Sequence, residues 1–179
     1  MPCSFEHLPS SDLIVITCKA FNDERGFFAE TYRLSEFEAN GIAAHFVQDN
    51  HSYSRRGVLR GLHFQRAPFA QGKLVRVALG TVWDVAVDIR PQSSFYGKWH
   101  GVTLSEENRL MLYIPPGFAH GFITVSEQAH LLYKCTAEYE HSSEGGIRWN
   151  DPDIAIEWPL TDIIVSERDA ALPYFRDLI

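Results

Sequence analysis

The sequence predicts an all-β fold, a sandwich or barrel of short strands, on three observations. Apolar runs of strand length recur at near-regular spacing along the chain. The turns between them are rich in glycine and proline, as in sandwiches and barrels. Residues 81–89 alternate strictly between two faces, which indicates a strand with one apolar side. The 179 residues contain no repeat or linker, so we expect a single domain over 1–179.

The first third of the chain is predicted to contain two strands and a short helix. The strands are expected at 13–17 and 27–32, with a turn at 22–26 between them. The segment 35–41 has the pattern of a helix, with Ser35 as its N-cap and Gly41 as its stop signal. An apolar pair running into a polar cluster follows at 46–52, and 55–57 is a turn.

The remaining chain continues as strands and turns. After strands at 60–65 and 71–77 and the alternating segment 81–89, strands are expected at 97–104, 110–114 and 128–137. The proline- and glycine-rich turn that begins at 115 delivers His120 to the start of another strand. An extended C-terminal arm starts at 148.

Composition excludes several classes of protein. A formal charge of -7 argues against nucleic acid as a partner, since binding its phosphates needs a surplus of Lys and Arg on one face. Cys3, Cys18 and Cys135 are too few and too irregularly spaced to suggest a disulfide framework or a zinc site, and a reducing compartment is the simpler interpretation. We find no signal sequence and no apolar run as long as a membrane span. The sequence therefore predicts a soluble, cytoplasmic protein without a membrane partner.

Two polar residues stand at strand positions where apolar residues are expected. Alternation places His63 on one side of its strand with Gly61 and Gln65, and Lys73 in line with apolar residues of what we expect to be the neighbouring strand. A lysine among valines is costly to keep charged unless it has a partner or a task. Either residue alone is more often structural, but together they indicate a site.

The histidine spacing does not favour a metal centre. A barrel metal site usually takes two histidines from alternate positions of one strand and a nearby carboxylate, but the alternate positions around His63 are Gly61 and Gln65. His120 stands alone as well. Neither a serine on a glycine-flanked elbow nor a glycine-rich phosphate loop is present. We therefore expect no bound metal.

Six motifs resemble those of the dTDP-4-dehydrorhamnose 3,5-epimerase family, in the family's order and over nearly the whole chain. They are RGLHFQ (60–65), QGKLVR (71–76), DVAVDIR (84–90), IPPGFAHGF (114–122), YK (133–134) and WNDP (149–152). The resemblance implies a cupin-type jelly-roll barrel with short peripheral helices, without metal or other cofactor. It also implies a homodimer that acts on a dTDP-linked 4-keto-6-deoxy sugar.

The family's chemistry gives the flagged residues roles. Removing a proton next to a ketone and replacing it on the opposite face needs a base, a cation or donor at the carbonyl oxygen, and an acid. The resemblance implies that His63 is the base, Lys73 the partner of the oxyanion and Tyr133 the acid. A carboxylate should orient the base. Asp169 resembles the family's dyad aspartate and is the first choice, and Asp84, on the polar side of its strand, is the second.

Further family positions imply contacts with the rest of the substrate. Arg25 and Arg60 fall on positions that hold phosphate, and Tyr139 on the position that stacks on the base. The other matched binding positions are Glu30, Gln48, Asn50, His120, Glu144 and Arg168.

The expected activity is inversion at C3 and C5 of dTDP-4-keto-6-deoxy-D-glucose to give dTDP-4-keto-L-rhamnose, in the biosynthesis of dTDP-L-rhamnose or a related deoxysugar. A relative that inverts only C3 or only C5 is the main alternative, since it could keep every residue named above. A ketoisomerase of the same barrel and a non-catalytic sugar-nucleotide-binding cupin are the others. The presence of His63, Lys73 and Tyr133 together argues against a purely binding role.

Overall fold

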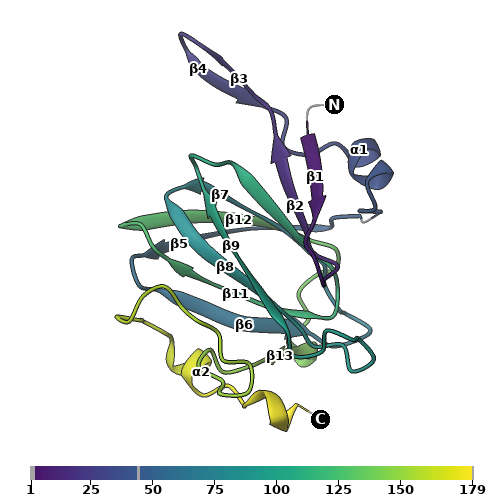
Figure 1. Cartoon of the computed structure of the whole chain (residues 1–179), viewed down its shortest axis with the longest axis vertical. Coiled ribbons are helices and arrows are strands. Elements are labelled where there is room, and N and C mark those ends of the chain that lie inside the picture. The colour runs from purple at the N-terminus through teal and green to yellow at the C-terminus, as the bar shows by residue number, and fades with distance from the viewer. Residues whose placement is uncertain (1–2, 44, 179) are drawn as a thin grey trace.

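The computed structural model describes residues 3–43 and 45–178, which fold as two antiparallel sheets packed face to face (Figure 1). The larger sheet has the strand order β1 (Cys3–His7), β2 (Ile14–Cys18), β10 (Leu110–Ile114), β7 (Lys73–Leu79), β12 (Gln128–Cys135) and β5 (Gln48–Arg55). The smaller has the order β13 (Glu144–Gly146), β6 (Leu59–Gln65), β11 (Phe118–Thr124), β8 (Thr81–Asp88) and β9 (Trp99–Ser105). This is the jelly-roll architecture that the resemblance implied.

Four short elements and a hairpin lie outside the two sheets. The hairpin of β3 (Ala20–Asp23) and β4 (Gly26–Ala29) projects from the end of the sandwich where β1 begins and β2 ends (Figure 1). The others are α1 (Leu34–Ala39), α2 (Glu167–Ala170) and the 3-10 turns η1 (His141–Ser143) and η2 (Phe175–Asp177). None of the helices in the described part of the chain has the length and apolar character that crossing a membrane requires.

The main core fills the space between the sheets. Buried residues from both sheets meet there, among them Val75, Val77, Leu112 and Leu131 from the larger sheet and Val82 from the smaller. The alternation seen in the sequence thus places Lys73 on the same inner side as Val75 and Val77.

The strand β8 corrects the expectation of a single apolar side. Asp84 and Ala86 are fully buried toward the interior, and Val85 and Val87 are fully buried on the other face. The second face is covered by the C-terminal arm, which packs Ile147, Ile154 and Trp158 against this sheet. Alternation in the sequence identified the strand but could not show that a later segment covers its outer side.

Helix α1 confirms the stop signal but not the cap. It begins at Leu34 with Arg33 in the N-cap position, so Ser35 lies inside the first turn and caps nothing. Its carboxyl end is followed by Gly41 with a φ of 88°, a conformation that glycine adopts at little cost. Phe37 and Ile42 are buried with Ile16, Leu74 and Met111 on the outer face of the larger sheet.

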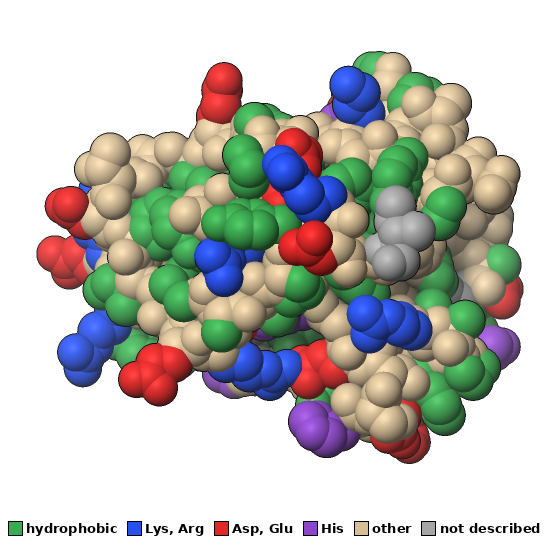
Figure 2. Space-filling view, turned by 90° about the horizontal axis from the view of Figure 1, so that it is seen from below, with side chains coloured by type: hydrophobic (Ala, Val, Ile, Leu, Met, Phe, Trp, Pro, Cys, Tyr) green, Lys and Arg blue, Asp and Glu red, His purple; other side chains and the backbone are tan. Residues whose placement is uncertain are grey.

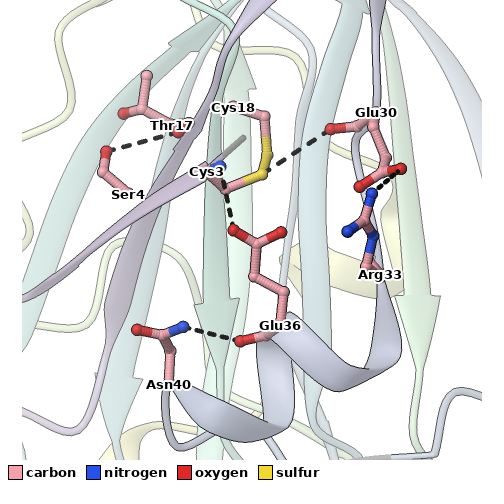
Figure 3. The surroundings of a disulfide bond; sticks show 8 residues. All are labelled: Cys3, Ser4, Thr17, Cys18, Glu30, Arg33, Glu36 and Asn40. Carbon is pink, nitrogen blue, oxygen red and sulfur yellow. Dashed lines mark hydrogen bonds and ion pairs between the residues drawn. A yellow bond between two sulfur atoms is a disulfide. The ribbon is translucent and has the colours of Figure 1, made fainter. Parts of the chain in front are cut away.

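A disulfide between Cys3 and Cys18 contradicts the expectation of unpaired cysteines. The two residues are direct partners in the antiparallel register of β1 and β2, which brings their side chains together (Figure 3). The backbone N–H of Cys3 also donates to Oε1 of the buried Glu36 on α1 (Figure 3). Cysteine spacing misses such a cross-strand pair because it depends on strand register, while Cys135 is free and buried.

Candidate active site

A cleft between the two sheets gathers most of the residues expected to act. One chamber, of about 320 Å³, is lined by Arg60, His120, Arg168 and Asp169 together with four shared residues. A second chamber, of about 170 Å³, is lined by Gln48, Asn50 and Tyr139 with the same four. The shared residues are His63, Lys73, Tyr133 and Glu144. The proposed base, oxyanion partner and acid therefore stand where the two chambers meet.

His63 and Lys73 face one another across the sandwich, and the expectation that their strands are neighbours is wrong. His63 lies on β6 of the smaller sheet, whereas Lys73 begins β7 of the larger one. The connection at 66–72 carries the chain from one sheet to the other, so consecutive strands are not paired. This crossing places the two side chains on opposite walls of one cleft.

His63 is oriented by Asp169. Nε2 of His63 lies 2.8 Å from Oδ1 of Asp169, and the backbone N–H of Gly61 donates to Oδ2 at 3.1 Å. Burial raises the pKa of the Asp169 carboxyl, but the hydrogen bond and charge of His63, the Gly61 N–H and Arg168 outweigh it and leave the pKa lowered. Asp169 is therefore an anion beside the imidazole, and it can steady the ring when His63 takes up a proton.

Asp84, the other candidate, is paired with a different histidine. Its two carboxylate oxygens lie 2.9 and 3.0 Å from Nε2 of His120, and both residues are buried. His120 is the direct partner of His63 in the register of β6 and β11. The strands come very close there, since a Cβ on Gly61 would lie 2.6 Å from Cα of Gly121. Two histidine–carboxylate pairs thus stand side by side.

Lys73 lies in an environment that disfavours the charged form of its side chain. Burial lowers the pKa of its ammonium group, and Cys135, Asp84 and Glu144 oppose that shift. Its Nζ lies 5.9 Å from the centre of the Tyr133 ring. A cation that is poorly solvated in the ground state is suited to an oxygen that becomes negative during reaction.

Tyr133 lies on β12, where its neighbours along the inner face are Leu131 and Cys135. Burial raises the pKa of its hydroxyl and Cys135 adds to the rise, whereas Arg60 opposes it. The phenol is therefore protonated at neutral pH. Its protonated hydroxyl stands on the wall of the larger sheet, opposite His63, as the predicted acid requires.

Glu144 lines both chambers. It forms an ion pair with Arg168, and Oη of Tyr139 donates to its Oε2 at 2.8 Å. Burial raises the pKa of Glu144, but the hydrogen bonds of Arg168 and Tyr139 and the nearby charges lower it further than burial raises it. The base-stacking candidate Tyr139 is thereby joined to α2, which also carries Asp169.

Arg60 enters the cleft through an irregularity in β6. It is three residues from His63, so simple alternation would put it on the opposite face. The register between β6 and β11 shifts between the pairs His120–His63 and Phe122–Arg60. Such a shift re-aims a side chain, and the guanidinium is held by hydrogen bonds to Oγ of Ser54 and to the carbonyl of Tyr53 on β5.

Two expected substrate contacts, Arg25 and Glu30, do not line the cleft. Arg25 is at the turn of the β3–β4 hairpin, paired with Asp23, and Glu30 follows β4 and pairs with Arg33. The hairpin points away from the end of the sandwich where β13 and α2 lie (Figure 1).

Neither the charge distribution nor the side-chain clusters indicate a different kind of site. The face that carries the C-terminal arm mixes Lys and Arg with Asp and Glu rather than presenting one sign (Figure 2). Across residues 3–43 and 45–178, no three His, Cys, Asp or Glu side chains are grouped so as to hold a metal ion.

Gln65 and Cys135 also line the cleft, although sequence reasoning assigned neither a role. Gln65 carried a usable signal, because it shares the inner side of β6 with His63. Cys135 is two residues beyond Tyr133 on the same strand face, and Nδ2 of Asn50 lies 3.5 Å from its sulfur.

The chain is similar to epimerases along nearly its whole length. Residues 7–177 match the model of the dTDP-4-dehydrorhamnose 3,5-epimerase family. The dTDP-4-dehydrorhamnose 3,5-epimerase of Salmonella typhimurium is 57% identical over 164 residues, 90% of each chain. A crystal structure of the Legionella pneumophila dTDP-6-deoxy-D-glucose-3,5-epimerase, in complex with dTDP-4-keto-L-rhamnose, superposes with a TM-score of 0.95 at 46% identity and covers 99% of this chain and 95% of that one.

A more distant neighbour has a narrower activity. The structure of a 3'-monoepimerase from Streptomyces bikiniensis in complex with dTDP-quinovose is 29% identical, with a TM-score of 0.88, covering 94% of this chain and 86% of that one. From the family match and the high identity over most of both chains, the chain belongs to the dTDP-4-dehydrorhamnose 3,5-epimerase family.

Proposed function

We propose that the protein inverts C3 and C5 of dTDP-4-keto-6-deoxy-D-glucose to give dTDP-4-keto-L-rhamnose. The observation that supports this best is the convergence of His63, Lys73 and Tyr133 on one cleft from two opposite sheets. A base and an acid on opposite walls can act on opposite faces of a flat intermediate, as inversion requires.

Each inversion proceeds through an enolate. The C4 ketone acidifies the proton on the neighbouring carbon, and His63 takes it while Asp169 steadies the resulting imidazolium. The electron pair left by the broken C–H bond moves onto the C4 oxygen, where Lys73 offsets the negative charge. Tyr133 then gives its proton to the carbon from the other side. Exchange with water reprotonates Tyr133 and deprotonates His63, so the reaction is an isomerisation without a co-reactant.

The nucleotide end of the substrate needs cations and a flat surface. Arg60 and Arg168 line the chamber next to His63, and a guanidinium suits phosphate because its fork pairs with two oxygens. Tyr139, at the far chamber, offers the aromatic face on which a thymine can stack. Gln48, Asn50, His120 and Glu144 supply the polar groups between them.

Incubation in heavy water tests the proposal and separates its alternatives. The protein is mixed with dTDP-4-keto-6-deoxyglucose, and proton NMR follows the signals of C3 and C5. Deuterium at both carbons with inverted product supports a 3,5-epimerase. Deuterium at C3 or C5 alone identifies a mono-epimerase, a possibility raised by the Streptomyces bikiniensis relative. A keto group that moves to C3 identifies a ketoisomerase, and binding without exchange identifies a non-catalytic cupin.

We also propose a homodimer in which the β3–β4 hairpin of one subunit reaches the cleft of the other. The hairpin exposes three aromatic side chains, Phe21, Phe27 and Phe28, which water solvates poorly. It also carries or adjoins Arg25 and Glu30, the two expected substrate contacts that lie away from their own cleft. A second copy of the chain accounts for both observations.

We treat the chain as one domain over 1–179 that works in the cytoplasm. The shared core and the docked C-terminal arm support a single folding unit, although residues 1, 2, 44 and 179 lie outside the described part. A nucleotide-linked sugar as substrate supports the cytoplasm, where nucleotides are available.

A further inference from the structure

Tyr139 is held in place mainly through its backbone. About half of the residue is exposed, with a relative accessibility of 51%, so packing alone does not fix it. It lies between β12 and η1, in a segment that belongs to neither element. The backbone N–H of Tyr139 donates to Oε1 of Gln48 at 2.8 Å. Its hydroxyl donates to Oε2 of Glu144 at 2.8 Å.

Gln65 binds the peptide groups on both sides of Tyr139. Its Nε2 donates to the carbonyl of Glu138 at 3.1 Å, and its Oε1 accepts from the N–H of Glu140 at 2.7 Å. The same Nε2 donates to the carbonyl of Phe69 at 2.7 Å. Gln65 is buried, and its Cα is the partner of Glu144 in the β6–β13 register. Strand β6 thus supports both the backbone around Tyr139 and Glu144, which accepts the hydrogen bond of the Tyr139 hydroxyl.

The hydrogen bonds of Gln65 leave it unsuited to bind substrate directly. A carboxamide has two N–H donors, and the carbonyls of Glu138 and Phe69 use both. Although Gln65 lines the cleft two residues from His63, it has no donor left for a ligand. Its contacts are those of a residue that fixes the backbone conformation of the 138–140 segment.

We propose that Gln65 is a positioning residue for nucleotide recognition, which fixes Tyr139 as a preformed platform for the base. The inference rests on the proposed function, because it takes the base of a dTDP-sugar as the occupant of Tyr139. Without Gln65 the 138–140 segment must be ordered when the nucleotide binds, and that ordering weakens affinity. The chemical step at saturation should be spared, because it occurs at His63, Lys73 and Tyr133.

A double-mutant cycle with dTDP as the probe tests the inference. The dTDP dissociation constant is measured by calorimetry for wild type, Gln65→Met, Tyr139→Ala and the double variant. Gln65→Met should raise the dTDP dissociation constant by about 5- to 20-fold, a range consistent with partial loss of base stacking. In the Tyr139→Ala background, Gln65→Met should change the dTDP dissociation constant by less than about two-fold. The effects of two substitutions do not add when one residue acts through the other. In turnover, KM should rise while kcat stays within about three-fold of wild type.

Two further variants make the result specific. Gln65→Glu keeps an acceptor for Glu140 but loses both donors, so it should also weaken dTDP binding, and it keeps the test decisive if Gln65→Met does not fold. Gln92→Met removes an exposed glutamine from the loop between β8 and β9 and should leave the dissociation constant unchanged. Hydrogen exchange adds a direct readout, since the Glu140 amide should exchange faster in Gln65→Met.

The outcomes separate this inference from the proposed function. Provided that wild type binds dTDP and epimerises its sugar, two results would overturn the positioning role alone. One is an equal loss of dTDP affinity on Gln65→Met in the wild-type and Tyr139→Ala backgrounds. The other is an unchanged dTDP dissociation constant in both Gln65→Met and Gln65→Glu. Wild-type protein that does not bind dTDP would overturn both.

Discussion

His63 is the side chain on which the proposed reaction depends most, because its imidazole is paired with the carboxylate of Asp169 and lines both chambers of the cleft. His63→Ala should therefore lower exchange at C3 and C5 by about 100- to 10,000-fold, the usual cost of losing a general base. Binding of dTDP should change little. The measurement is deuterium incorporation, with the exposed His7→Ala as the control. A variant that keeps more than about a tenth of the wild-type rate would show that the base is another residue.

Tyr133 offers a test of the second half of the reaction. Tyr133→Phe removes the hydroxyl and keeps nearly the same apolar volume, so the strand should tolerate it. His63 can still take a proton and return it to the same face, so deuterium should enter the substrate while inverted product falls much further. Exchange by NMR and product by a coupled reductase are measured on one sample, with the buried Tyr113→Phe on the outer face as control. If both fall equally, the acid lies elsewhere.

Burial of Lys73 should destabilise the folded protein, although its ammonium group serves the proposed reaction. Burial lowers its pKa, so between the folded and the ordinary lysine pKa the unfolded chain binds more protons, and stability rises with pH across that window. Below the window the full cost is present. Lys73→Met should therefore raise the free energy of unfolding at neutral pH by roughly 0.5–2 kcal/mol and abolish epimerisation.

Urea denaturation at several pH values measures the effect of Lys73→Met, which should shrink as pH approaches the ordinary lysine value. The exposed Lys98→Met is the control. A variant that is less stable than wild type at neutral pH would mean that the neighbours of Lys73 fully compensate its burial.

At the scale of elements, the strand pair β1–β2 is stabilised by the Cys3–Cys18 bond. The bond closes a loop with a sequence separation of 15, for which reduction should lower the free energy of unfolding by about 3 kcal/mol. Neither cysteine lines the cleft, so epimerisation should be unaffected. Urea denaturation with and without reductant measures the first effect, in a Cys135→Ser background that removes the free thiol. Activity lost on reduction would mean that this pair of strands affects the cleft.

The strands were largely predictable because a half-buried strand alternates, and the segments 110–114 and 81–89 were recognised almost to the residue. The strand β5 was not, since it is polar on both faces: Asn50 faces the cleft and Asp49 pairs with Lys134 outside. Periodicity also carries no information on which strands pair, and for that reason His63 and Lys73 were placed on neighbouring strands instead of opposite walls.

The site residues, like the strands, were predictable only in part. Family motifs located the cleft residues, but the sequence could not rank Asp169 against Asp84. The distance of Asp169 from His63 depends on how the C-terminal arm docks, and that of Asp84 depends on β11 lying between β8 and β6 in the sheet. The sequence also left Gln65 without a role, since the contacts of that residue are to backbone groups that have no signature in the sequence.

At the scale of the whole molecule, the proposed dimer makes a quantitative prediction. Arg25→Ala and His63→Ala should each be inactive alone, because each removes a different part of every cleft. After the two proteins are mixed, unfolded and refolded together, mixed dimers hold one cleft with both residues intact. Activity should return to about a quarter of the wild-type value, given random pairing.

Size-exclusion chromatography with light scattering shows whether the mixture is dimeric. Each variant refolded alone is the control. A dimeric mixture without recovered activity would place Arg25 outside the partner's cleft, and a monomeric wild type would refute the dimer.

The pairing of His63 with Asp169 also has a consequence for how the enzyme matures during its synthesis. The two residues are 106 positions apart, and every strand of both sheets precedes Asp169 in the chain, so all of them emerge from the ribosome before it does. The barrel can therefore collapse around an imidazole that still lacks its carboxylate, since chains fold from the N-terminal side as they emerge. The proposed base gains its carboxylate only when α2 docks, so folding of the barrel and the onset of activity are separate events in time.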